Sequence, residues 1–121
     1  MRFTADVAQV PRARHWVVQE ATAAGASHDA LRVVALLASE LVTNAVQHGP
    51  AGGEVVVTVE RRGDRMRVAV RDESPRPPIR LDPDPTHLSG RGVQLVDRLA
   101  AAWGVDGDAG GKIVWFEVAA T

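Results

Sequence analysis

Two neighbouring segments with alternating apolar and polar residues most constrain what this chain can fold into. Glu54 to Arg62 and Arg65 to Asp72 are separated by Gly63-Asp64, which suits a two-residue turn between antiparallel strands. Because side chains alternate between the faces of a strand, this turn gathers valines on one face and mostly charged residues on the other. The valine face is the inward one, with members at positions 55, 57, 59, 68 and 70.

The register set by this turn makes further predictions. Arg62 should face Arg65, and Glu60 should face Arg67 as a favourable cross-strand pair. The same alternation places Asp72 on the inward face at the end of its strand. A buried carboxylate costs free energy unless something pairs with it, so Asp72 is a candidate functional residue.

A long helix is expected between Ser27 and Gly49. Ser27 is a good N-cap, Asp29 complements the positive end of the helix dipole, and Gly49-Pro50 ends the helix. The apolar face has helical spacing and consists of Leu31, Val34, Leu37, Leu41 and Val42.

Two polar residues lie near the end of this helix. Glu40 and Asn44 are four residues apart and therefore stack on one face, with Gln47 and His48 one turn further on. They could point to solvent at the edge of a packed helix, as polar residues on amphipathic helices usually do. They could instead form the polar wall of a pocket, and the spacing alone leaves both interpretations open.

The remaining segments complete an α/β pattern. A Pro-rich, non-regular connection follows Asp72 up to Gly92, and a connection of that length inside a compact domain is usually functional or mobile. The segment 113–118 is nearly continuously apolar and indicates an interior strand. The other expected elements are a strand near 2–5, a helix from about 11 to 25, a helix at 93–102, and strands at 103–108 and 112–119.

Gly90-Arg91-Gly92 is expected to open the helix at 93–102. A helix start presents free backbone N–H groups and the positive end of a dipole, which together favour an anion. This tripeptide is therefore a candidate anion-binding segment.

Composition limits the classes of function. A length of 121 residues predicts a single domain over residues 1–121. With 14 basic and 15 acidic residues, the chain has no charge signature for direct nucleic-acid or membrane binding. It contains no Cys, no apolar run of membrane-spanning length and no signal-peptide pattern, so a cytoplasmic location is expected.

Two groups of side chains are given structural interpretations. The aromatic residues Trp16, Trp103, Trp115 and Phe116 are interpreted as core. We interpret a group of arginines as a solvated face of the sheet, with a protein-docking surface as the alternative. These arginines are at positions 61, 62, 65, 67 and 71.

Glu40 with Asn44, the inward Asp72 and the glycine-flanked helix start together resemble the ATP-binding site of the GHKL superfamily. That superfamily includes gyrase, large heat-shock chaperones, histidine kinases and anti-sigma-factor serine kinases. Within it the chain is most similar to the stand-alone RsbW-like serine/threonine kinases. The resemblance implies a two-layer α/β sandwich of the Bergerat type, with a mixed, mainly antiparallel sheet and helices on one face.

The resemblance also implies a role for each residue. Asn44 matches the family's magnesium ligand, and Glu40 its general base. Asp72 matches the aspartate that accepts a hydrogen bond from the adenine amino group. Gly90 and Gly92 match glycines that let backbone N–H groups approach the phosphates, and Arg91 between them could neutralise phosphate charge or face solvent. The implied cofactors are ATP and Mg²⁺.

The sequence departs from the family pattern in two places. The family's Asp-x-Gly-x-Gly motif is replaced by the residues 72–76, which contain no glycine, and Lys112-Ile113 offers no hydroxyl where the family often has Thr or Ser. The expected lid, from about 78 to 89, is short.

The function implied by the resemblance is regulation of transcription by acting on other proteins. The chain would transfer the γ-phosphate of ATP to a serine of an anti-anti-sigma (STAS-type) partner, sequester a sigma factor, or both, and a homodimer is an open alternative. A non-catalytic ATP-binding or protein-binding module of the same fold is the competing hypothesis.

Overall fold

The computed structural model describes residues 1–74, 88–108 and 110–121, and of 88–93 and 108 it describes the backbone alone. The helical elements are a short 3₁₀ helix and three α-helices: η1 Val7–Gln9, α1 Val10–Ala23, α2 His28–His48 and α3 Leu88–Leu99. The strands are β1 Arg2–Thr4, β2 Glu54–Arg62, β3 Arg65–Asp72, β4 Ala102–Asp108 and β5 Gly111–Ala119.

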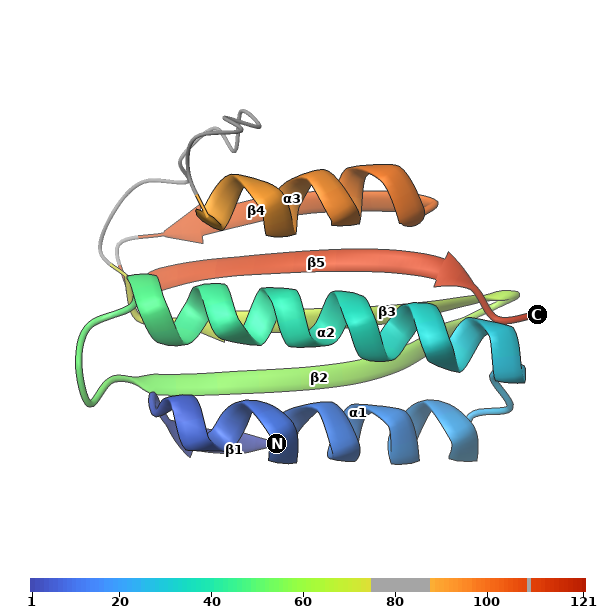
Figure 1. The fold of residues 1–121 in the computed structure, drawn as a ribbon, viewed down its shortest axis with the longest axis horizontal. Coiled ribbons are helices and arrows are strands. Elements are labelled where there is room, and N and C mark those ends of the chain that lie inside the picture. Colours follow the sequence, from blue (N-terminus) through green and yellow to red (C-terminus); the bar gives the residue numbers. More distant parts are fainter. Residues whose placement is uncertain (75–87, 109) are drawn as a thin grey trace.

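The molecule has two layers. The strands form a sheet in the order β1-β2-β3-β5-β4, and the three α-helices lie side by side across one of its faces (Figure 1). Every strand pairing among the described residues is antiparallel. The predicted two-layer α/β sandwich is confirmed.

The β2–β3 hairpin has the predicted register. Arg62 pairs with Arg65 and Glu60 with Arg67. Gly63 has a φ of 62°, which suits the first central position of a type II′ turn, where glycine meets no steric penalty. The turn chemistry and the alternation therefore agree, and together they fix the face on which Asp72 lies.

The core lies between the valine face of the sheet and the helices. Val55, Val57, Val68 and Val70 are almost fully buried, as is Phe116 of β5. The helices contribute, among other residues, Val17, Val34, Leu37, Leu41 and Val42. Burying a large aliphatic side chain contributes about 1.5–3 kcal/mol, so this interface is the main force that holds the two layers together.

Some predicted boundaries were wrong. Helix α3 was expected at 93–102, but it begins at Leu88 and ends at Leu99. Gly90 and Gly92 were expected to precede the helix, since glycine has a low helix propensity, but tertiary context can override propensity. In the structure they lie within the helix, and Ala102 already belongs to β4.

The sheet face away from the helices carries a charged cluster and one aromatic residue that was predicted to be core. Trp115 lies on this open face because successive side chains of β5 point to opposite faces of the sheet, and Phe116 points into the core. A Cβ at Gly104 would come within 2.8 Å of the indole ring, so the absence of a side chain there lets Trp115 lie close against β4. The Arg67 guanidinium stacks on the indole at 4.0 Å from the ring centroid.

Glu117 is the centre of that charged cluster and is only 8% exposed. Arg67 Nε donates to its Oε2 at 2.8 Å, and Arg65 Nη1 donates to its Oε1 at 3.3 Å. The hydrogen bond from Arg67 is the main cause that holds the pKa of Glu117 below its ordinary value, against the opposing effect of burial. Arg61 departs from the solvated-face interpretation, because it donates to the Ala24 carbonyl at 2.7 Å, just past the end of α1.

Candidate functional site

Several chain segments converge at one end of the sheet. The C-terminal end of α2, the end of β3, the start of β5 and the start of α3 lie at the same end of the molecule (Figure 1, left). Asp72, the last residue of β3, pairs with Lys112 near the start of β5. The topology therefore brings together three of the elements on which sequence reasoning placed functional residues.

Asp72 is buried at this end, with 3% of its side chain exposed. Its Oδ1 accepts a hydrogen bond from the Ser74 N–H at 2.8 Å, a local turn in which an Asp side chain bonds the backbone two residues on. Its Oδ2 lies 3.9 Å from Lys112 Nζ, which is an ion pair but too long for a hydrogen bond. Oδ2 thus keeps the capacity to accept a hydrogen bond from another donor.

Ser74 takes the place where the family pattern has a glycine, and it is buried as well, at 2% exposure. Its backbone N–H fixes one oxygen of Asp72, so the orientation of the carboxylate is set locally. This support was not foreseen from the sequence, where Ser74 appeared only as a departure from the motif.

Two glycines allow neighbouring segments to close on Asp72. A Cβ at Gly49 would lie 2.7 Å from the Ala45 carbonyl oxygen and 3.5 Å from the Asp72 Cβ, so the end of α2 packs directly against β3. Gly111 has a φ of 156°, and a Cβ there would collide with the Asp72 carbonyl oxygen. From the sequence, Gly49 was assigned only to ending the helix.

Glu40 and Asn44 lie on α2, one turn apart and half-buried. They flank the buried stripe that includes Leu41 and Ala45. Within the described parts of the chain, no hydrogen bond or ion pair involves either side chain. Both side chains therefore lie at the edge of the core rather than on the fully exposed face of the helix.

Gly90 lies in the first turn of α3, whose leading N–H groups have no partner within the helix. Gly92 lies just beyond that turn. The Arg91 side chain and nearly all of the expected lid at 78–89 fall outside the described residues.

The residues present fit a nucleotide with its metal ion. Asn44 offers a carboxamide oxygen, a ligand type that suits Mg²⁺ when phosphate oxygens and water complete the coordination. No group of three or more His, Asp or Glu side chains that could hold a metal by itself occurs among the described residues. A metal ion here would therefore depend on the phosphates of a bound nucleotide.

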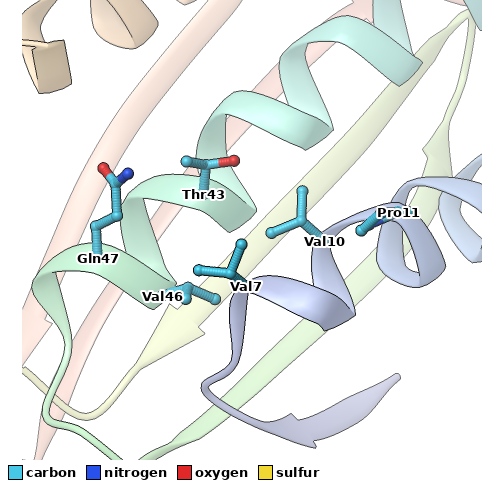
Figure 2. A pocket seen from close by; sticks show the side chains of 6 residues that line it. All are labelled: Val7, Val10, Pro11, Thr43, Val46 and Gln47. Atoms are coloured by element: carbon cyan, nitrogen blue, oxygen red, sulfur yellow. The ribbon is translucent and has the colours of Figure 1, made fainter.

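An apolar groove of roughly 270 Å³ lies on the opposite flank of α2, between that helix and the η1–α1 segment (Figure 2). Thr43 is about 100° round the helix from Asn44, so the groove faces α1; Gln47 lines it, but Glu40 and Asn44 do not. Val7 at its rim is 69% exposed. The residues that line the groove are Val7, Val10, Pro11, Thr43, Val46 and Gln47.

Within the described part of the chain, no helix is long and apolar enough to cross a membrane.

The fold agrees with comparisons to known proteins. The profile of the histidine kinase-like ATPase domain matches residues 3–118, so the chain belongs to that family. The predicted membership of the GHKL superfamily is confirmed. No curated protein matches the chain.

Solved structures share the fold. The histidine kinase domain of the Erythrobacter litoralis blue-light activated histidine kinase is 33% identical, with a TM-score of 0.57, and the match covers 72% of this chain and 43% of that one. The RsbU and RsbW domains of a Mycobacterium tuberculosis protein are 20% identical, with a TM-score of 0.68, covering 98% and 32%. Full-length ShkA in complex with AMPPNP is 22% identical, with a TM-score of 0.63, covering 97% and 30%. This chain spans less than half the length of each.

Proposed function

We propose that the sheet end around Asp72 binds Mg-ATP and that the chain is a serine/threonine protein kinase of the RsbW-like kind. The observation that carries the proposal is the buried Asp72 carboxylate, oriented by Ser74 and with Oδ2 left to accept a hydrogen bond. Oδ2 accepts no hydrogen bond from the described residues, and the adenine amino group is a donor of the right chemistry for it.

The proposed roles follow the positions of the side chains. Asp72 holds the adenine amino group, Asn44 binds Mg²⁺ together with the phosphates, and the backbone at Gly90 and Gly92 approaches the phosphates. Arg91 is assigned to neutralising phosphate charge. Such a site works mainly by positioning and by electrostatic stabilisation, because phosphoryl transfer demands little covalent chemistry from the protein.

Glu40 is proposed to accept the proton of the attacking hydroxyl. The serine oxygen of the partner forms a bond to the γ-phosphorus, the bond from that phosphorus to the β,γ-bridging oxygen breaks, and ADP leaves. The proton passes from the serine to the Glu40 carboxylate. The half-buried position of Glu40, one turn from Asn44, supports this assignment.

The protein partner is proposed to be an anti-anti-sigma (STAS-type) protein that carries the acceptor serine, with a sigma factor as the target that is sequestered. We place this activity in the cytoplasm. The similarity to an RsbW domain supports the choice of partner class, and the AMPPNP bound to ShkA supports an adenine nucleotide as the ligand.

A non-catalytic binding module is the second candidate. The apolar groove of Figure 2, with the exposed Val7 at its rim, favours it because such a surface can hold a partner's apolar side chain without any phosphate transfer. In that case the nucleotide would have only a structural or regulatory effect.

A phosphorylation assay separates the two candidates. The purified chain is incubated with radiolabelled Mg-ATP and each STAS-type protein encoded in its own genome. The kinase predicts a labelled serine in one of these partners. ATP binding without label on any of them would overturn the kinase and leave the binding module.

A further inference from the structure

Lys112 is the only lysine among the 121 residues, and it lies at the candidate site. It pairs across the sheet with Asp72, and directly opposite residues on neighbouring strands share a face. Lys112 therefore faces the helix layer together with Asp72. Only 15% of its side chain is exposed, which is unusual for a residue that normally keeps its ammonium group in water.

The surroundings of Lys112 leave its ammonium group directed at this site. Its neighbour on β4 is Gly107, which adds no side chain on that flank. Among the described residues, Asp72 is the one acidic group within ion-pair distance, with Nζ and Oδ2 separated by 3.9 Å. At that separation neither group is engaged in a direct hydrogen bond to the other, so each can bond to a third group placed between them.

The two groups have complementary chemistry. A carboxylate only accepts hydrogen bonds, and an ammonium only donates them. The adenine ring carries an amino donor next to the ring nitrogen N1, which is an acceptor. An adenine that donates to Asp72 Oδ2 through the amino hydrogen on the N1 side turns N1 toward the ammonium group on the adjacent strand.

We propose that Lys112 is a second base-recognition residue, which donates a hydrogen bond to adenine N1 while Asp72 accepts one from the amino group. The proposal rests on the nucleotide site proposed above. It assigns a base contact to Lys112, which in the sequence analysis was noted only because it lacks the hydroxyl that the family often has there. A hydrogen bond from a charged donor is stronger than a neutral one, so the contact should be visible in affinity.

The test compares ATP with 1-deaza-ATP, in which a C–H group replaces N1. Affinities are measured by calorimetry for the wild-type protein and for Lys112→Met, which keeps a similar length and an apolar stem but has no donor. The wild-type protein should bind 1-deaza-ATP about tenfold or more weakly than ATP, because a charged hydrogen bond is lost. In Lys112→Met the two ligands should bind with nearly equal affinity.

A second measurement does not depend on the variant's stability. Lys112 carries the only side-chain amine, so acetylation of the wild-type protein can be followed at this residue by mass spectrometry, with the Met1 amine as an internal control. The Met1 amine hydrogen-bonds the Val57 carbonyl of β2. ATP should slow acetylation of Lys112 several-fold and leave Met1 unchanged, and 1-deaza-ATP at equal occupancy should protect Lys112 less.

The outcomes distinguish this proposal from the proposed function. If the wild-type protein binds ATP and 1-deaza-ATP equally, or if Lys112→Met discriminates between them as the wild-type protein does, Lys112 does not contact N1. If the wild-type protein does not bind ATP at all, the nucleotide site itself is wrong, and the contact fails with it.

Discussion

At the scale of single residues, the candidate site depends on how one carboxylate is held. Asp72 is buried, one oxygen is fixed by the Ser74 N–H, and the other lies near a cation without bonding to it. Such an arrangement orients an acceptor before a ligand arrives, so little conformational entropy is lost when the ligand binds.

Asp72→Asn should weaken ATP binding by about tenfold or more and narrow the preference for ATP over GTP. The asparagine oxygen can still accept from the Ser74 N–H, which places its NH₂ group where Oδ2 was and turns a donor toward the adenine amino group. Competition calorimetry with ATP and GTP measures both effects. The control is Asp106→Asn, because Asp106 is an exposed acidic residue on β4; this substitution should change neither the ATP affinity nor the preference for ATP over GTP. An unchanged ATP affinity in Asp72→Asn would show that the adenine base binds elsewhere.

Glu117 gives a prediction for pH dependence. Its pKa is held below its ordinary value of 4.5, chiefly by the hydrogen bond from Arg67, so the ionised form stabilises the folded state at neutral pH. That stabilisation is complete above the ordinary pKa and is lost as the pH falls through the lowered pKa. Glu117→Gln should therefore be less stable than the wild-type protein at pH 7, and the difference should shrink below about pH 4.5.

The measurement is urea unfolding of both proteins from pH 7 down to pH 3. A stability difference that stays constant over this range would mean that the charge of Glu117 is not what stabilises the open face of the sheet.

At the scale of elements, α2 carries both the metal ligand and the base of the proposed mechanism. Glu40→Ala should keep ATP affinity within a few fold but reduce phosphoryl transfer by about a hundred to ten thousand fold, because a base acts on the attacking oxygen in the transition state. Asn44→Ala should instead remove the magnesium dependence of ATP binding. Arg32→Ala, on an exposed position of the same helix, is the control and should affect neither property.

Transfer assays with the partner and binding titrations with and without Mg²⁺ provide the two readouts. If Glu40→Ala and Asn44→Ala have the same effect on both, the division of roles along α2 is wrong.

The start of β5 is the second element that shapes the site. Gly111→Ala should destabilise the fold by at least about 3 kcal/mol, because the φ of 156° disfavours a side chain and the added Cβ would collide with the Asp72 carbonyl. Gly52→Ala is a matched control: its φ is 75°, but nothing lies within 4 Å of the added Cβ, so only the conformational cost of about 1–2 kcal/mol applies. Equal losses of stability in urea unfolding would show that β5 does not close tightly on Asp72.

At the scale of the whole molecule, the predictions that held rest on local rules. Turn chemistry at Gly63-Asp64 and the alternation of side chains were sufficient for the β2–β3 register, and that register placed Asp72 on the inward face. The N-cap at Ser27, whose Oγ accepts from the Ala30 N–H at 3.1 Å, located the start of α2 in the same way.

The predictions that were wrong or missing depend on contacts between distant parts of the chain. Trp115 was interpreted as core because the apolar run of β5 hides its alternation, and only pairing with β3 and β4 shows which face it takes. Lys112 could not be linked to Asp72 from the sequence, because 40 residues separate them and the β3–β5 register is set by the fold. The start of α3 was misplaced because the local sequence does not show that the helix continues through Gly90 and Gly92, where tertiary context overrides their low propensity.

A calorimetric titration of the purified chain with Mg-ATP tests the central claim most directly, with a thermal-shift measurement on the same sample. A nucleotide site at the end of the sheet predicts saturable binding with one ATP per chain, a dependence on Mg²⁺, and a higher melting temperature in its presence. Millimolar Mg-ATP that gives neither heat of binding nor a shift in melting temperature would contradict the claim.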